Sequence, residues 1–305
     1  MMENNMEDYR KAGKITAEAL DIARARVSEG YSLLELAEEI ESFIAKSGAR
    51  PAFPVNISIN DAAAHFTPSS DCDAVFKRGD VVKVDCGASI DGCMGDSAIT
   101  IEVGTNAFLP LVESSKRALE RVISEIRADT KTGNIGEVIE REITGFGFRP
   151  IENLSGHQIA RYSLHAGISI PNVAEKISDR IRENMVVAVE PFATNGNGYV
   201  VENENGNIYQ FSDRRVHNAL ANKLADAIRK DAHLSKLPLC ERWCVKLGVE
   251  IGMGIGEVHR AMKVLERSRV LRNYPVLREG GDGIVSQWEH TLFIKDNGCE
   301  ILTKK

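Results

Sequence analysis

Two aspartates lie in neighbouring strand-like segments that a predicted hairpin turn joins. The segments DVVKVDCGASI and CMGDSAITIEV flank Asp91-Gly92, a dipeptide typical of two-residue hairpin turns. Counting outwards from this turn, Asp85 is expected to face Ala98. Asp96 is expected to face Gly87, which makes the two aspartates diagonal neighbours on one face of the hairpin. Two buried carboxylates would repel each other and need an ion pair or a cation, although ordinary aspartates on a solvent-facing side fit the hairpin equally well.

Two histidines and two glutamates supply further groups of the same chemical kind. His157 and His165 each stand near a glycine and are eight residues apart, an even spacing that returns to the same face of one extended strand. Glu190, in VVAVEPF, and Glu289, in VSQWEHTLFI, lie inside apolar strand-like runs, where a carboxylate is costly unless it is paired or metal-bound. Taken singly, each histidine fits an ordinary core or surface residue, and each glutamate fits a structural salt bridge.

Taken together, these groups predict a metal centre. Four carboxylates and one imidazole carry a charge that two divalent cations balance; they are Asp85, Asp96, His157, Glu190 and Glu289. Oxygen-rich ligation with one nitrogen suits Mn, Fe, Co or Zn better than a closed structural zinc site. Two such metals, about 3.5–4 Å apart, hold a bridging hydroxide that is nucleophilic at neutral pH. The expected reaction class is therefore metal-assisted hydrolysis.

Apolar periodicity predicts the elements that position these groups. Residues 1–50 predict two helices, the second opening with the capping box Ser32-Leu-Leu-Glu35 and ending at Gly48. Helical patterns return over 110–144 and 218–268, and further strands are expected in ENLSGHQI, MVVAVEPFAT and IVSQWEHTLFI. The polar patch TNGNGYVVENENGN carries no predicted element, and Asp296-Asn297-Gly298 predicts a closing hairpin. The pattern indicates a mixed α/β domain that a helical insert interrupts late in the chain.

Composition excludes several classes of protein. The chain has 305 residues, of which 43% are hydrophobic and 27% charged, and this balance excludes disordered, collagen-like and disulfide-scaffold chains. No apolar run approaches the roughly 18–20 residues that span a bilayer. The start of the chain, MMENNMEDYR, is polar and acidic, unlike a signal or transit peptide, so a cytoplasmic protein without a membrane partner is expected. Six cysteines without CxxC spacing are expected to be reduced.

Charge is distributed unevenly along the chain. The net charge of −6 argues against a chain that wraps nucleic acid by bulk electrostatics. Residues 212–278 nevertheless hold 14 Lys and Arg against 7 Asp and Glu, a net of +7, which leaves −13 elsewhere. This basic insert is expected to be a solvated or salt-bridged face, with a ribosomal RNA contact as the alternative. His217, His233 and His259 lie within it and are expected at the surface, and His290 is expected on the strand face opposite to Glu289.

Five stretches carry a family resemblance that covers nearly the whole chain. In chain order they are DAAAHFTP, KVDCGASIDGCMGDSAIT, SGHQIARYSLHAGISIPN, VVAVEPFAT and VSQWEHTLFI. Together they resemble the methionine aminopeptidases, M24 metallopeptidases, and in particular the compact archaeal form of their type 2 branch. The type rests on the helical block between Glu190 and Glu289, which are 99 residues apart, because type 1 enzymes lack that insertion.

The resemblance implies an α+β fold with a pseudo-symmetric pita-bread (creatinase/aminopeptidase) core and a helical, winged-helix-like insert. The implied division is a first core segment over 1–195, the insert over 196–278 with boundaries uncertain by eight residues, and a closing core hairpin over 279–305. Two divalent ions (Co, Mn, Fe or Zn) are implied as cofactors. Asp85 would bind one metal, His157 and Glu190 the other, and Asp96 and Glu289 would bridge both.

The resemblance also implies the catalytic and pocket residues. Glu190 would serve as general base and acid, moving a proton from the bridging water to the leaving amine. His165 would hydrogen-bond the scissile carbonyl or its oxyanion, and His65 would line the pocket. Phe53, Leu164 and Tyr274 would help to line an apolar pocket for the methionine side chain.

The implied activity is removal of the initiator methionine from nascent polypeptides with a small second residue, by a monomeric enzyme. Two alternatives stay open. Xaa-Pro aminopeptidases and prolidases share the core and the five ligands. Some relatives have lost ligands and act as ribosome- or RNA-associated adaptors without catalysis, a role for which the basic insert would be the place to look.

Overall fold

The computed structural model describes residues 2–305, so that Met1, the first residue of the predicted first core segment, lies outside it. The helices are α1 (Met2–Arg26), α2 (Leu33–Lys46), α3 (Leu109–Glu125), α4 (Thr132–Gly145), α5 (Ala219–Lys230), α6 (Glu241–Glu250) and α7 (Ile255–Arg267). The strands of the first half are β1 (Arg50–Pro51), β2 (Asn56–Ile59), β3 (Ala62–Ala64), β4 (Val81–Ile90) and β5 (Cys93–Glu102). The later strands are β6 (Arg149–Pro150), β7 (Ser155–Ala160), β8 (Ser163–Pro171), β9 (Val186–Val189), β10 (Phe192–Thr194), β11 (Val200–Phe211), β12 (Leu239–Cys240), β13 (Leu271–Glu279), β14 (Val285–Gln287), β15 (His290–Lys295) and β16 (Gly298–Ile301).

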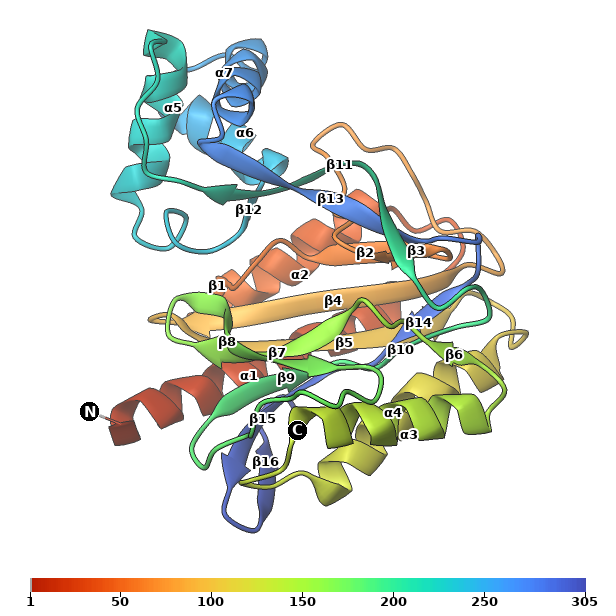
Figure 1. Ribbon diagram of the computed structural model, residues 1–305. Helices are drawn as coiled ribbons and strands as arrows, with labels where there is room; N and C mark the ends of the chain where they lie inside the picture. Colours follow the sequence, from red (N-terminus) through yellow and green to blue (C-terminus); the bar gives the residue numbers. More distant parts are fainter. Residues whose placement is uncertain (1) are drawn as a thin grey trace.

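The first half of the core is a helix pair packed on an antiparallel sheet. Strands β1, β4 and β2 pair in that order, and β5 joins them through β4. Helices α1 and α2 share one apolar core with this sheet (Figure 1). The β4–β5 register places Asp85 opposite Ala98 and Asp96 opposite Gly87, so the hairpin prediction is confirmed.

The second half repeats this plan. Helices α3 and α4 pack together and share an apolar core with strands of the sheet β16-β15-β9-β7-β8 (Figure 1). The closing hairpin is confirmed, because Lys295 pairs with Gly298 at the predicted turn. The halves are bound to each other where Glu289 N donates to Ala98 O (3.0 Å) and Thr291 Oγ1 donates to Asp96 O (2.7 Å). This repetition agrees with the predicted pseudo-symmetric α+β core.

The late helices α5, α6 and α7 form a separate apolar cluster with the far ends of β11 and β13. In Figure 1 they stand to one side of the two halves, and β11 and β13 run between them and the core. Strand β13 continues into the core, where it pairs with β3. The division of the chain at 195 and 278 remains a prediction, since these two strands belong to both regions.

The polar patch TNGNGYVVENENGN differs from the sequence reading. Most of it lies in β11, which pairs with β13 from Val200↔Glu279 to Phe211↔Leu271 through two register shifts. The partner strand lies 60 to 80 residues later in the chain and supplies the backbone hydrogen bonds of β11. The polar sequence of the patch does not indicate a strand. Local periodicity therefore missed a strand that depends on a distant partner.

Two further sequence expectations are tested by the described residues. Within 2–305, no helix is long and apolar enough to cross a membrane. The six cysteines are free thiols, and Cys86, Cys93, Cys240 and Cys244 are buried, as expected for reduced side chains packed as small apolar groups.

Candidate metal centre

The five predicted ligands lie on or directly beside different strands and line one cavity of about 130 Å³. Asp85 lies on β4 and Asp96 on β5, the two strands of the confirmed hairpin. His157 lies on β7 in the second sheet. Glu190 directly follows β9, and Glu289 lies between β14 and β15. Both halves of the core therefore supply groups to the same point.

The distances within the cluster fit a shared cation. Single ligand atoms of Asp96, His157 and Glu289 lie within 4.8 Å of one another. His157 Nε2 is 3.6 Å from Asp96 Oδ2 and 3.7 Å from Glu190 Oε1. These separations are too long for hydrogen bonds but are typical of atoms that bind a common ion at about 2.0–2.2 Å each.

Two buried oxygens of the cluster lack partners. Asp85 Oδ1 and Glu289 Oε1 accept no hydrogen bond from the described residues, and Glu289 is 1% exposed. An unsatisfied buried oxygen of this kind costs about 1–3 kcal/mol, and more when charged. Carboxylate oxygens with one imidazole are a donor set that first-row divalent metals accept. The residues present therefore fit a metal ion.

Burial and mutual repulsion shift the titration of the cluster. Desolvation raises the pKa of Asp85 to about 7. Desolvation, followed by repulsion from neighbouring carboxylates, raises the pKa values of Asp96, Glu190 and Glu289 well above their ordinary range. Desolvation and the nearby His165 lower the pKa of His157 to about 3, so its imidazole is neutral, which is the metal-binding form. A cation would favour the ionised form of these carboxyl groups, against the desolvation and repulsion that raise their pKa values.

Gln287 is a site residue that the sequence reasoning missed. It is 1% exposed, and its Nε2 donates to Glu190 Oε2 (3.3 Å). Gln287 N also donates to Thr100 Oγ1 (2.8 Å), which fixes the residue against β5. A signal was available, because Gln287 precedes Glu289 by two residues in the same apolar run and is equally costly to bury.

His157 and His165 meet for a different reason from the one that the spacing suggested. The prediction of one continuous strand is wrong, since β7 ends at Ala160 and the chain turns back into β8. A register shift in this hairpin brings the two rings to 4.5 Å in an edge-to-face arrangement. His165 has an accessible side chain, and desolvation by the cavity wall lowers its pKa.

His65 lies in the same cavity in an unusual backbone conformation. Its φ of 66° is in the left-handed region, which a side chain other than glycine adopts at a cost of about 1–3 kcal/mol. Its Nδ1 is 3.3 Å from Pro275 O, and its ring lies 5.4 Å from that of Tyr274. Desolvation and the nearby His165 lower the pKa of His65 to about 4.

The remaining predicted pocket residues also line this cavity. Phe53 and Leu164 are 5% and 9% exposed and belong to one apolar cluster, and Tyr274 forms part of the wall with Ile208 and Leu277. The structure thus brings every predicted site residue to one cavity, whose lining includes both apolar side chains and carboxylates.

The expectation for His233 is wrong. This histidine is 6% exposed, and its Nε2 lies 2.8 Å from Pro51 O because the insert folds against the core and covers it. His217 is exposed, as expected, and His259 is half-exposed beside Glu241.

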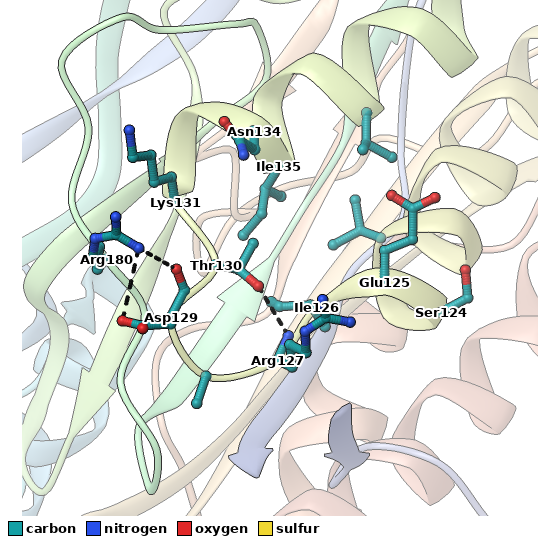
Figure 2. A pocket seen from close by; sticks show the side chains of 13 residues that line it. Ser124, Glu125, Ile126, Arg127, Asp129, Thr130, Lys131, Asn134, Ile135 and Arg180 are labelled. Carbon is teal, nitrogen blue, oxygen red and sulfur yellow. Dashed lines mark hydrogen bonds and ion pairs between the residues drawn. The ribbon is translucent and has the colours of Figure 1, made fainter. Parts of the chain in front are cut away.

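A larger, open cavity of about 740 Å³ lies where α3 ends and α4 begins. Figure 2 shows that its charged side chains, including Arg127, Lys131 and Arg180, are spread around the rim. Arg180 donates to Asp129 O (2.9 Å), an ordinary surface interaction. None of the predicted site residues is among its described lining residues. Volume therefore does not mark the functional site, whereas converging buried carboxylates do.

Comparisons with known proteins agree with this geometry. A sequence profile of metallopeptidase family M24 matches residues 7–296. The chain is 43% identical to the methionine aminopeptidase of Methanocaldococcus jannaschii over 303 residues, which cover 98% of this chain and 99% of that protein. It is also 43% identical to the methionine aminopeptidase of Pyrococcus horikoshii over 296 residues, 96% of this chain and 98% of the other.

Solved structures show the fold. The methionine aminopeptidase of Thermotoga maritima aligns with a TM-score of 0.70 at 23% identity, over 99% of this chain and 97% of that one. A thermophilic Arx1 aligns with a TM-score of 0.80 at 15% identity, over 98% and 90%. The prolidase of Pyrococcus furiosus aligns with a TM-score of 0.63 at 19% identity, over 99% of this chain and 64% of that one. The α+β core is therefore the pita-bread fold that these proteins share.

Proposed function

Because the chain belongs to metallopeptidase family M24, we propose that its buried carboxylate cluster holds divalent metal and cleaves the first peptide bond after an amino-terminal methionine. Its activity is that of a methionine aminopeptidase, since archaeal methionine aminopeptidases match it over nearly the full length of both chains. The observation that carries the assignment of the site is the pair of buried oxygens without partners, Asp85 Oδ1 and Glu289 Oε1, on two residues that line the cavity.

The proposed centre holds two divalent ions of Co, Mn, Fe or Zn. Asp85, Asp96, His157, Glu190 and Glu289 would hold the ions. Support comes from the charge of four carboxylates, which exceeds what one divalent ion balances, and from ligand atoms of three residues within 4.8 Å of one another. When bound, the ions activate water and polarise the scissile carbonyl.

The side chains around the centre then move and hold protons. Glu190 takes a proton from the attacking water and passes it to the leaving amine, as a carboxylate within reach of both can accept and return a proton. Gln287 Nε2 holds one Glu190 oxygen and so directs the other towards the reacting atoms. His165, neutral and accessible, donates its N–H to the carbonyl oxygen as charge develops on it.

The apolar side of the cavity suits a methionine side chain. Phe53, Leu164 and Tyr274 supply its wall, and His65 closes it against Pro275. We propose that nascent polypeptides with a small second residue are the substrates, as the type 2 branch implies. A cytoplasmic location and a monomeric state stay predictions from the sequence.

Two further candidate roles have less support. The prolyl alternative rests on likeness of fold at 19% identity, whereas the methionine aminopeptidases match at 43%. A ribosomal contact is favoured by the basic insert: Arg260, Lys263 and Arg267 are exposed at helical spacing on one side of α7. Other basic residues of the insert are neutralised, since Arg229 pairs with Asp213 and Asp226. Co-sedimentation with ribosomes at low and high salt tests this contact, and no association at low salt would exclude it.

Release of free methionine from Met-Ala-Ser tests the proposal. The metal-stripped chain should release no methionine, and two equivalents of Co or Mn should restore the release. Glu190→Ala should abolish it, while Glu183→Ala, a change to an exposed glutamate outside the cavity, should not. Cleavage of an Xaa-Pro peptide with silence on Met-Ala-Ser would favour the prolyl alternative. Silence on both, with no metal bound, would favour an adaptor.

A further inference from the structure

A buried ion pair joins the insert to the core. Arg242, on α6, is 6% exposed, and Glu41, on α2, is 8% exposed. Arg242 Nη1 donates to Glu41 Oε2 (2.8 Å), and Nη2 donates to Glu41 Oε1 (2.9 Å). Trp243 Nε1 donates to the same carboxylate (2.8 Å). Two neighbouring residues of α6 are thus fixed to one side chain of the core.

The same pair holds two separate backbone segments of the core. Val55 N donates to Glu41 Oε1 (3.2 Å), and Arg242 Nε donates to Pro68 O (2.8 Å). Thr67 connects the segments, because its Oγ1 accepts from Arg242 Nη2 (3.0 Å) and donates to Val55 O (2.8 Å). Arg242, Glu41 and Thr67 together therefore tie residues 53–56 to residues 65–68, beside one direct backbone hydrogen bond from Ile57 N to Phe66 O (2.7 Å).

Both segments carry walls of the catalytic cavity. Phe53 and Asn56 flank Val55, and His65 stands two residues before Thr67; all three line the cavity. Asn56 is 6% exposed, and its Oδ1 has no partner among the described residues, so its position depends on the backbone that holds it. The Nδ1 atom of His65 also lies 3.3 Å from Pro275 O. Pro275 belongs to β13, the strand that continues into the insert.

We propose that Arg242 and Glu41 are positioning residues for methionine recognition, an inference that rests on the proposed function. They set the separation of Phe53 and His65 across the apolar pocket, so the insert takes part in selecting the substrate side chain. Neither residue touches the substrate; both act through the backbone of the two segments.

The chemistry of the pair favours positioning over simple attachment. A buried ion pair recovers little net free energy after desolvation, and an apolar contact would attach the insert as well. Arg242 instead uses the planar fork of its guanidinium to bond a carboxylate, a carbonyl and a hydroxyl in fixed directions. A lysine retains the charge and loses these directions. An ordinary exposed attachment exists nearby, where Arg50 bonds Asp231 at 2.8 Å with nearly half of the arginine exposed.

Arg242→Lys and Thr67→Val test the proposal, with Arg50→Ala as the matched control at the same interface. In Arg242→Lys, kcat/KM for Met-Ala-Ser should fall by about 10–100-fold, since misplacement by about 1 Å of a positioning group has that effect. Its preference for Met-Ala-Ser over Leu-Ala-Ser should fall by about tenfold, because apolar pockets discriminate such side chains by roughly 10–200-fold. Thr67→Val should shift both values in the same direction by about threefold or more, because it removes both hydrogen bonds of Thr67 Oγ1. Arg50→Ala should change neither.

Hydrogen exchange supplies a measurement that does not depend on activity. The Val55 amide should exchange faster in Arg242→Lys, while amides within α5 and α7 keep their protection. Unchanged methionine preference and unchanged Val55 exchange in a folded Arg242→Lys chain would overturn the proposal, even if its melting temperature falls. If Arg242→Lys does not fold, Thr67→Val decides by the same criteria. A wild-type chain that releases no methionine would refute the proposed function. The rate of Val55 amide exchange in Arg242→Lys would still test the positioning role.

Discussion

Glu279 and Glu289 are ten residues apart, are 3% and 1% exposed, and have opposite environments. The carboxylate of Glu279 accepts four backbone N–H groups, from Asn197, Gly198, Gly281 and Gly283, at 2.5–3.0 Å. Glu289 Oε1 has no partner among the described residues, although Glu289 lies beside other carboxylates. Desolvation raises the pKa of both groups, but at Glu279 the backbone donors outweigh it and the pKa is lowered. At Glu289 nearby carboxylates add to it.

The difference separates two uses of a buried acid. Backbone donors of the protein stabilise the Glu279 carboxylate. The same hydrogen bonds fix two glycine-containing segments, at residues 197–198 and 281–283. Glu289 and its neighbours are left without protein donors, which the folded chain tolerates only if the carboxyl groups stay protonated or if a cation supplies positive charge. Burial of a carboxylate alone is therefore poor grounds for a site, and the absence of protein donors around it is what points to a metal.

Glu190→Gln should have the largest effect. The amide keeps the size of the side chain but cannot carry a proton between water and amine, so kcat should fall by about 10²–10⁴-fold. Methionine release from Met-Ala-Ser measures it, with metal content determined in parallel. A variant that keeps full activity would remove Glu190 from the proton path and leave the cluster a ligand set only.

Stability of the metal-stripped chain should depend on pH in a direction set by the cluster. Because the folded pKa of Asp85 is raised from 3.8 to about 7, the folded chain holds a proton that the unfolded chain loses near pH 4. Stability is then fully present at low pH and is lost as pH rises towards 7. We expect the free energy of unfolding to fall by about 3 kcal/mol between pH 5 and pH 8, and Mn or Co to restore it at pH 8.

Urea titrations at each pH measure this slope, and Asp85→Asn is the control, since the amide does not titrate. The slope should flatten in that variant. An equal slope in both chains would mean that Asp85 does not govern the pH dependence.

The sequence was sufficient for features with local signals. The turn at Asp91-Gly92 fixed the opposition of Asp85 and Ala98, because a two-residue hairpin has one register. Glu190 and Glu289 were found because a carboxylate in an apolar strand is costly. The resemblance supplied His65, whose local sequence, DAAAH, has no distinctive pattern.

Features that depend on distant partners could not be predicted in this way. His157 and His165 were expected on one strand, and only the return of the chain after Ala160 shows that a hairpin brings them together. Glu41 and Arg242 are 201 residues apart, so no local pattern marks them as a pair. His233 reads as a surface residue until the insert is folded against Pro51.

Glu279→Gln and Glu289→Gln compare the two environments directly. At Glu279 the change leaves one oxygen acceptor and turns an amide NH2 towards two of the four backbone donors. Each hydrogen bond to a charged group is worth about 1.5–3 kcal/mol, so the loss of two should lower the free energy of unfolding by about 3 kcal/mol or more. At Glu289 the same change removes a repelled carboxylate, so the metal-stripped chain at pH 8 should gain stability. Urea unfolding measures both. Equal losses at the two positions would show that the environments do not differ as the hydrogen bonds indicate.

Glu300 represents the third environment, an exposed pair, and should give the smallest effect. Its carboxylate accepts from Arg10 Nε (2.7 Å) and lies 2.9 Å from Lys295 Nζ, and 27% of its side chain is exposed. The hydrogen bond from Arg10 lowers the pKa of Glu300 to about 2.

The pair therefore contributes to the free energy of unfolding above pH 4.5, and this contribution is lost as pH falls towards 2. Because solvent screens an exposed pair, Glu300→Gln should cost less than about 1 kcal/mol at pH 7 and a smaller amount at pH 2.5. Urea unfolding at the two pH values measures this. A loss at pH 7 as large as that of Glu279→Gln would mean that partner number, rather than burial, decides what a carboxylate contributes in this fold.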